Sequence, residues 1–204
     1  MKKFKLILFT IICFNAFCQD QGNYQLIING KTETIDVDQK IIYKTPNGEN
    51  IEIELKQKPI LSYSDNFVSF EYPKEYKPTK TDLGSGIEQI AIFSSLGTGV
   101  MIQEYSTMNP ETMNELMLTE ITKERIEYGY KMKRKDFTHK TKSGQEITGI
   151  KATLKYQDDI QEYIIASFGQ KDKGVLVMTM INDEFRKQEK IILETFYDSL
   201  FLNF

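Results

Sequence analysis

The sequence predicts an α+β fold in which an antiparallel β-sheet is flanked by two helices and preceded by an N-terminal β-hairpin appendage. The first observation is residues 150–156, where apolar side chains fall on every second position, as in a half-buried strand. The second is that residues 163–168 and 175–181 are apolar on both faces, as expected of central strands. Short polar segments separate the three runs, so neighbouring strands should pair antiparallel as a meander.

The third observation is a pair of amphipathic segments that predict the two helices. Asn109, Pro110 and Glu111 provide a capping side chain, a proline at the first helical position and an acid near the positive helix end. Gly129 is placed to end this helix. The second helix should begin near Asn182 or Asp183. The predicted inward-facing residues are Met113, Leu116, Met117, Ile121 and Tyr128 in the first helix, and Phe185, Ile192, Phe196 and Leu200 in the second.

The N-terminal part of the mature chain, residues 19–58, consists of short strand patterns and turns. The Asn29-Gly30 pair is a specific hairpin signal, and a second turn follows at Pro46-Asn47-Gly48. We expect a β appendage here, a linker over residues 59–65, and one main domain over residues 59–204 that opens with a strand at 66–73. Strands are also expected at 87–93 and 100–105, after turns at Gly84 and Gly97.

The first 18 residues have the features of a secretory signal peptide. Lys2, Lys3 and Lys5 precede an apolar run of residues 6–14, which is too short to span a bilayer. Cleavage between Cys18 and Gln19 fits the small residues before that bond, and the alternative is a lipoprotein acylated on Cys18. The protein is therefore expected to be exported to the periplasm or cell surface.

Composition excludes several classes of function for the mature chain. Both cysteines lie in the signal segment, so the domain must fold without a disulfide and has no thiol chemistry. Loss of the three signal lysines changes the formal net charge from −3 to about −6, which disfavours non-specific nucleic-acid binding. No long apolar run follows the signal, so no transmembrane segment is expected after it.

Motifs for catalysis, cofactors or metals are weak. The single histidine, His139, lies among lysines without a second metal-ligating His or Cys, and no serine lies in a Gly-x-Ser-x-Gly elbow. The Gly84 and Gly97 segments lack the remaining residues of nucleotide-binding loops and are interpreted as turns. The acidic pairs, Asp36 with Asp38 and Asp158 with Asp159, lack a complete calcium loop. We therefore expect no enzymatic activity, cofactor or metal.

One concentration of charge is a candidate contact surface. If residues 131–142 form a strand, Lys131, Lys133 and Lys135 share one face. The alternative is an edge strand that lysines protect from aggregation. The complete set of candidate partner-binding residues is Lys131, Lys133, Arg134, Lys135, Lys140 and Lys142.

The order of these elements resembles the PsbP-like superfamily over about residues 66–204. The features that carry the resemblance are the strand ending in Tyr72-Pro73, the helix over 110–128, the hairpin at Ser143-Gly144-Gln145, and the closing helix that ends near Leu200. The resemblance implies an α/β/α sandwich used mainly for binding, as in photosystem subunits, a nuclear import factor, secretion chaperones and lipoproteins. The signal and the Lys-, Ile- and Asn-rich composition also resemble exported Bacteroidetes proteins.

These observations favour an exported, non-enzymatic binding or accessory protein whose partner is a protein or an envelope component, and an anionic one if the basic segment is the contact surface. One alternative is a carrier of a small apolar molecule or lipid, with a pocket lined by Met113, Met117, Met178 and Met180. A hydrolase that uses His139 is a third and weaker hypothesis.

Overall fold

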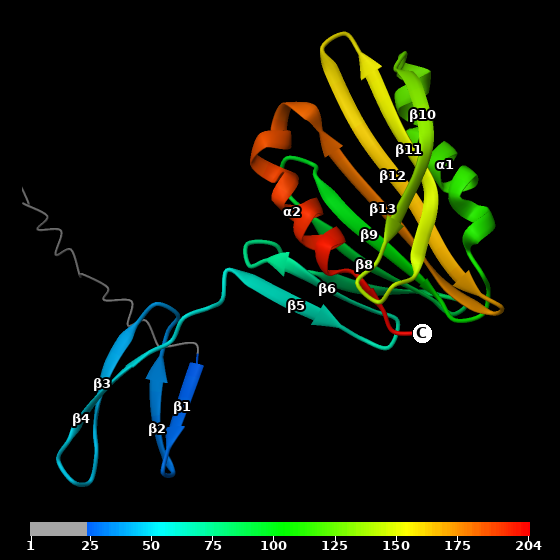
Figure 1. Cartoon of the computed structure of the whole chain (residues 1–204). Helices are drawn as coiled ribbons and strands as arrows, with labels where there is room; N and C mark the ends of the chain where they lie inside the picture. The colour runs from blue at the N-terminus through cyan, green and yellow to red at the C-terminus, as the bar shows by residue number, and fades with distance from the viewer. Residues whose placement is uncertain (1–23) are drawn as a thin grey trace, which may run out of the picture. The chain divides into compact units, whose positions relative to one another are not determined.

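The computed structural model describes residues 24–204 and divides the chain into two compact units, residues up to 57 and residues 58–204 (Figure 1). The predicted signal segment, including the Cys18–Gln19 cleavage position, lies outside the described residues. Each unit is described separately below.

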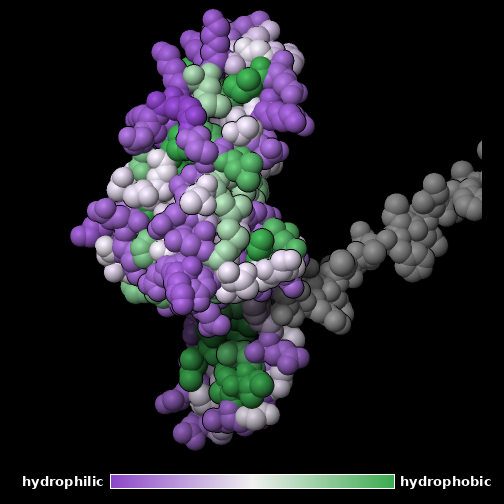
Figure 2. All heavy atoms as spheres, turned by 90° about the vertical axis from the view of Figure 1, so that its right-hand side faces the viewer, coloured by the Kyte–Doolittle hydropathy of each residue, from purple (hydrophilic) through white to green (hydrophobic). Residues whose placement is uncertain are grey.

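The N-terminal unit contains two antiparallel hairpins. Asn29 and Gly30 connect the first two strands with positive φ angles of 49° and 80°, which are the backbone angles that an Asn-Gly turn favours. Ile35 and Tyr43 are buried, whereas Ile27 and Ile42 are exposed, and Figure 2 shows hydrophobic side chains gathered on one side of this unit. The strands are β1 (Tyr24–Ile28), β2 (Lys31–Ile35), β3 (Lys40–Lys44) and β4 (Asn50–Glu54).

The second unit is built on a seven-stranded antiparallel sheet with the order β10-β11-β12-β13-β9-β8-β7. The predicted meander is confirmed, because β11 pairs with β12 and β12 with β13, both antiparallel. β7 was not predicted, and it forms the edge opposite β10. The strands are β7 (Thr79–Gly84), β8 (Ile87–Phe93), β9 (Gly99–Tyr105), β10 (Lys131–Lys140), β11 (Glu146–Tyr156), β12 (Asp159–Gln170) and β13 (Lys173–Asn182).

Helix α1 (Asn114–Tyr128) packs on one face of this sheet, after a 3₁₀ turn at η1 (Glu111–Met113) (Figure 1). The predicted start is partly confirmed. Asn109 Oδ1 accepts a hydrogen bond of 2.9 Å from the Glu111 N–H, but the chain forms the 3₁₀ turn first and α1 begins at Asn114 without a side-chain cap. Gly129 ends the helix with a φ of 115°, also as predicted.

The predicted inward stripe of α1 is partly wrong. Leu116 is 58% exposed and Tyr128 is 69% exposed, whereas Leu118 and Thr122 are buried. Thr122 can face the core because its hydroxyl donates a hydrogen bond of 2.7 Å to the Leu118 carbonyl. The methionines Met113, Met117, Met178 and Met180 all belong to the hydrophobic cluster between α1 and the sheet, so core packing accounts for them.

Helix α2 (Arg186–Ser199) covers part of the opposite face and follows a 3₁₀ turn at η2 (Asp183–Phe185). Ile192, Phe196 and Leu200 are buried as predicted, and Phe185 is half-buried. The same face is also covered by a small sheet with the order β14-β6-β5. These elements share one hydrophobic cluster with the large sheet. The α+β class with a large antiparallel sheet and two helices is therefore confirmed.

The small sheet corrects the predicted linker. Residues 59–65 contain β5 (Ile60–Ser64), which pairs with β6 (Val68–Pro73) and places the half-buried Tyr63 on Phe70 with ring centroids 5.1 Å apart. The linker prediction is wrong because these residues gain both ladder hydrogen bonds and an aromatic contact from β6. The predicted strand at 66–73 corresponds to β6, which is thus the second strand of the unit.

The C-terminal residues complete the small sheet through β14 (Phe201–Leu202), which pairs with β6. The Asn203 N–H donates to the Phe67 carbonyl at 2.8 Å, and the Gln145 side-chain amide donates to the Phe204 carbonyl at 3.2 Å. The last residues therefore connect β6 to the turn between β10 and β11. Neither helix of residues 24–204 has the length and apolar character needed to cross a membrane.

Candidate functional site

The predicted basic segment forms strand β10, one of the two edge strands of the large sheet. Successive side chains of a strand point to opposite faces. Phe137 packs on Tyr197 of α2 and His139 on the same ring, so every second residue of β10 lies on the α2 side of the sheet. Lys131, Lys133 and Lys135 belong to this alternate set and are exposed. These three lysines lie on the part of β10 that precedes the two residues in contact with α2.

Part of the sheet on this side is left uncovered. Helix α2 packs on β6, β13 and β9, and the end of the sheet near the β11–β12 turn extends beyond it (Figure 1). A hollow of about 600 Å³ lies there, lined by Lys131, Lys133, Lys155 and the apolar side chain of Ile160, together with other residues of this end of the sheet. Lys155 lies on the same side of the sheet as Lys131, because the two residues are opposite each other in the β10–β11 register.

The charge of this basic face is not neutralised locally. Lys131, Lys133 and Lys155 form no ion pair with any residue in the described part of the chain. Lys151, on the same side of β11, is bound to Glu162 at 2.6 Å. We define the basic face as Lys131, Lys133, Lys135 and Lys155.

The other predicted contact residues lie elsewhere. Arg134 points to the α1 side, where it forms an ion pair with Glu115. Lys140 lies at the opposite end of β10, and Lys142 follows it beside the C-terminal strand, where its N–H donates to the Leu200 carbonyl at 2.7 Å. The six predicted residues therefore do not form one surface, because strand alternation and strand length separate them.

The remaining chemical candidates have structural roles. His139 Nε2 lies 2.9 Å from the Tyr197 carbonyl oxygen, which can only accept a hydrogen bond. Asp159 accepts hydrogen bonds from Tyr130, Gln161 and Asn182, and so connects strand ends rather than a ligand. Within residues 24–204, no three His, Cys, Asp or Glu side chains are grouped as a metal site would require.

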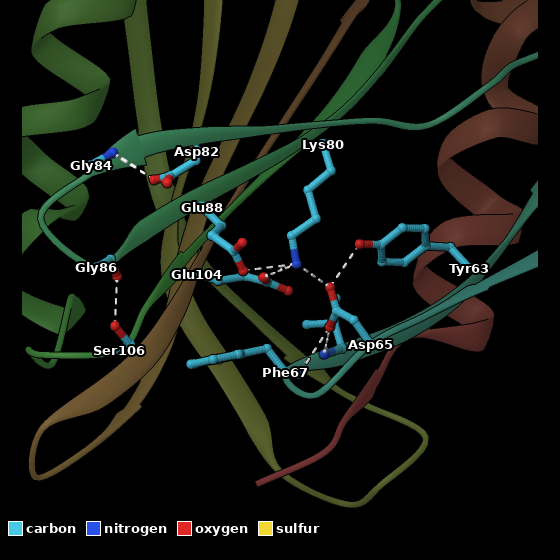
Figure 3. A network of polar contacts seen from close by, with 11 residues as sticks. Tyr63, Asp65, Phe67, Lys80, Asp82, Gly84, Gly86, Glu88, Glu104 and Ser106 are labelled. Atoms are coloured by element: carbon cyan, nitrogen blue, oxygen red, sulfur yellow. Dashed lines mark hydrogen bonds and ion pairs between the residues drawn. The ribbon is translucent and has the colours of Figure 1, made fainter.

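Sequence reasoning missed a second site, a partly buried network around Lys80 of β7 (Figure 3). Lys80 Nζ lies 2.7 Å from Asp65 Oδ2, 2.9 Å from Glu88 Oε2 and 3.0 Å from Glu104 Oε2. Tyr63 donates its hydroxyl to Asp65 at 2.7 Å, and the backbone N–H groups of residues 67 and 68 donate to the other Asp65 oxygen. The network joins the small sheet to β7, β8 and β9.

The three acids of the network differ in how well they are solvated. Glu104 is only 1% exposed, and its Oε1 has no hydrogen-bond partner among the described residues. Leaving a buried acceptor without a donor costs about 1–3 kcal/mol. Glu88 is half-exposed and Asp65 receives four hydrogen bonds. Glu104 is therefore the one acid of this network that lacks a full set of partners.

The protonation equilibria follow from these environments. Burial raises the pKa of Glu104 to about 7, and the nearby Asp65 carboxylate adds to this effect although Lys80 opposes it. Burial alone would also raise the pKa of Asp65, but hydrogen bonds from Lys80, Val68, Tyr63 and Phe67 outweigh it and lower the pKa to about 2. Burial acts to lower the pKa of Lys80, and its three carboxylate partners raise it well above its ordinary value.

A cavity of about 280 Å³ adjoins this network, and both Glu88 and Glu104 line it. Gly84, Ser85 and Gly86 also line it, and Figure 3 shows Gly84 and Gly86 at the turn between β7 and β8. Gly84, Ser85 and Gly86 have φ angles of 80°, 55° and 78°, which confirms the prediction of a turn. Only the turn could be found from sequence, because the acids that converge on Lys80 come from segments up to 39 positions apart, from Asp65 to Glu104.

No protein-family model matches the chain, and no curated protein shows a significant match to it.

Proposed function

We propose that this is an exported, non-enzymatic binding protein of the cell envelope, and that its basic face binds an anionic partner. The observation that carries the proposal is the hollow of about 600 Å³ beside Lys131, Lys133 and Lys155, on a part of the sheet that α2 leaves uncovered. Positive charge that is not paired with a carboxylate attracts an anionic partner and accelerates its association.

The competing interpretation is edge protection, since β10 is an edge strand and lysines discourage pairing with another chain. That role needs charges on β10 only. Lys155 is on β11, inside the sheet, and lies on the same side as the β10 lysines. A basic surface that spans two strands and borders a hollow supports binding more than edge protection alone.

The PsbP-like resemblance belongs to the same proposal. The strand that ends at Tyr72-Pro73, the helix after β9, the turn at Ser143-Gly144 and the closing helix occur in the order that the resemblance implies. We infer a PsbP-like sandwich, whose members serve mostly as binding proteins, but a shared fold does not identify the partner. Export rests on the signal sequence of residues 1–18.

The test is recovery of partners from envelope extracts by the wild type and by a charge-reversed variant, Lys131→Glu with Lys133→Glu and Lys155→Glu. A matched control, Lys74→Glu with Lys123→Glu and Lys187→Glu, changes the same charge at exposed lysines outside the basic face. We expect the first variant to lose the wild-type partners at about 50 mM salt and the control to keep them, and salt of about 500 mM to weaken recovery because screening shortens the Debye length.

Vesicles with and without an anionic phospholipid form a second arm, which distinguishes a lipid surface from an acidic protein. If the two variants recover the same partners and bind the same vesicles as the wild type, then the basic face is only a protected edge and the proposal is wrong.

A further inference from the structure

The cavity beside Glu104 is a second candidate binding site, separate from the basic face. It lies at the other edge of the large sheet, near the β7–β8 turn. Its wall contains three acidic side chains, an aromatic ring and a hydroxyl group, contributed by Asp82, Glu88, Glu104, Phe67 and Ser106.

Glu104 provides the observation that points to a ligand. Its side chain is 1% exposed and lines the cavity, and its Oε1 has no hydrogen-bond partner among the described residues. Oε1 exposes almost no surface to solvent, so a rotation of the Glu104 carboxylate toward the cavity would bring it to a donor there and complete its hydrogen bonding. The other oxygen, Oε2, is already held by Lys80 at 3.0 Å.

The negative charge of the groups around the cavity favours a cationic ligand. Asp65, Asp82, Glu88 and Glu104 are the acids in or beside the cavity, and Lys80 is the single cation of the network in the described chain. Carboxylates outnumber the ammonium group, so an added positive charge is favoured over an anion or a neutral group.

The chemistry of the site favours an ammonium group over a metal ion. The described residues contain no cluster of three acidic or imidazole ligands arranged for a metal. Lys80 itself shows how the network accommodates an ammonium, with three carboxylate oxygens at 2.7–3.0 Å. Phe67 adds an aromatic ring to the wall, and such rings attract organic cations. We propose that this cavity binds a primary ammonium group, which donates a hydrogen bond to Glu104 Oε1.

The experiment is calorimetric titration of the full chain with ethylammonium chloride. Tetramethylammonium chloride has the same charge but no N–H donor, and sodium chloride controls for ionic strength. We expect binding of ethylammonium at pH 8, where Glu104 is ionised, and weaker binding at pH 5.5. Both reference salts should bind more weakly than ethylammonium, because neither cation has an N–H donor for Glu104 Oε1.

Three variants identify the acceptor. Glu104→Gln keeps the size of the side chain but removes its charge, and should weaken ethylammonium binding by about tenfold or more. Glu120→Gln, an exposed position on α1, makes the same chemical change elsewhere and should leave binding unchanged. Glu88→Gln changes an exposed wall residue, so it tests the cavity even if substitution of the buried Glu104 impairs folding.

The source of the ammonium group is tested with a short peptide that carries one lysine and with its acetyl-lysine form. Binding of the lysine peptide, but not of the acetylated one, would identify a side chain as a ligand, while binding of ethylammonium alone would identify a small free amine. Equal heats for ethylammonium and tetramethylammonium, or unchanged binding by both Glu104→Gln and Glu88→Gln, would overturn the proposal.

Discussion

The two edge strands of the large sheet both expose lysines, but the surroundings of these lysines differ. On β7, Lys80 is held by three carboxylates from three other segments, and the resulting network joins two sheets. On β10, Lys131 and Lys133 have no carboxylate partner in the described chain and border a hollow. The role of an edge lysine therefore depends on its neighbours across the sheet. These neighbours come from distant segments of the chain, so the local sequence does not identify them.

The largest expected effect is the loss of Lys80. Lys80→Met would leave Asp65, Glu88 and Glu104 close together without a cation, and removal of one partner from a buried ion pair typically costs about 3–5 kcal/mol. Because Lys80 is 32% exposed, we expect about 3 kcal/mol, at the lower end. Urea denaturation at pH 7.5 measures the free energy of unfolding.

Lys133→Met is the matched substitution on the opposite edge and should change stability by no more than about 0.5 kcal/mol. The contrast between the two edges would be lost if both substitutions cost the same. Adding Glu104→Gln to Lys80→Met should recover part of the loss, because it removes one of the uncompensated charges.

The second prediction concerns the pH dependence that Glu104 confers. Its pKa rises from an ordinary 4.5 to about 7 in the folded protein, so the folded state binds the proton more tightly than the unfolded state. Stability from this group is therefore highest below pH 4.5 and falls as the pH rises to about 7. At about 1.4 kcal/mol per pKa unit, the loss is at most about 3.5 kcal/mol.

Glu104→Gln isolates this effect, because glutamine does not titrate. The unfolding free energy of Glu104→Gln relative to the wild type should increase between pH 4.5 and pH 7.5, and Glu120→Gln should show no such trend. Asp65 titrates in a separate window, because its lowered pKa of about 2 means that its contribution is lost only as the pH falls below about 3.8. A constant difference between pH 4.5 and pH 7.5 would contradict the raised pKa of Glu104.

The smallest expected effect compares a turn glycine near each edge. Gly86 and Gly144 have φ angles of 78° and 93°, so alanine is strained at both positions by about 1 kcal/mol. A Cβ at position 86 would also lie 2.5 Å from Ser106 Oγ, whereas nothing lies within 4 Å of a Cβ at position 144. Gly86→Ala should therefore lower stability by about 1 kcal/mol more than Gly144→Ala in thermal or urea unfolding. Equal losses would show that Ser106 moves aside freely.

Local patterns in the sequence predicted much of this fold. The alternating and doubly apolar runs of β11, β12 and β13, the Asn109 turn that precedes α1 and the Asn29-Gly30 hairpin are all set by residues close together in the chain. Three strands were missed. β14 has only two residues, which is too few to show a pattern. All six residues of β7 are exposed, so the strand has no apolar periodicity, and β5 follows Pro59 and resembles a linker until it is placed beside β6.

The candidate sites were less predictable because they are assembled across strands. The alternation of Lys131, Lys133 and Lys135 was visible in the sequence, but the contribution of Lys155 required the β10–β11 register. The alternating Lys151 and Lys155 in β11 were the one local signal for it. Glu104 appears in the sequence as an ordinary strand residue, and its proximity to Lys80 and Phe67 is visible only in the folded chain.

The pairing of β14 with β6 has a consequence for the order of events during synthesis. Residues 200–204 bind β6 and the β10–β11 turn, so the opening and closing segments of the second unit must come together before its small sheet is complete. During synthesis from the N-terminus, β6 therefore lacks its β14 partner until residues 201–202 have been made.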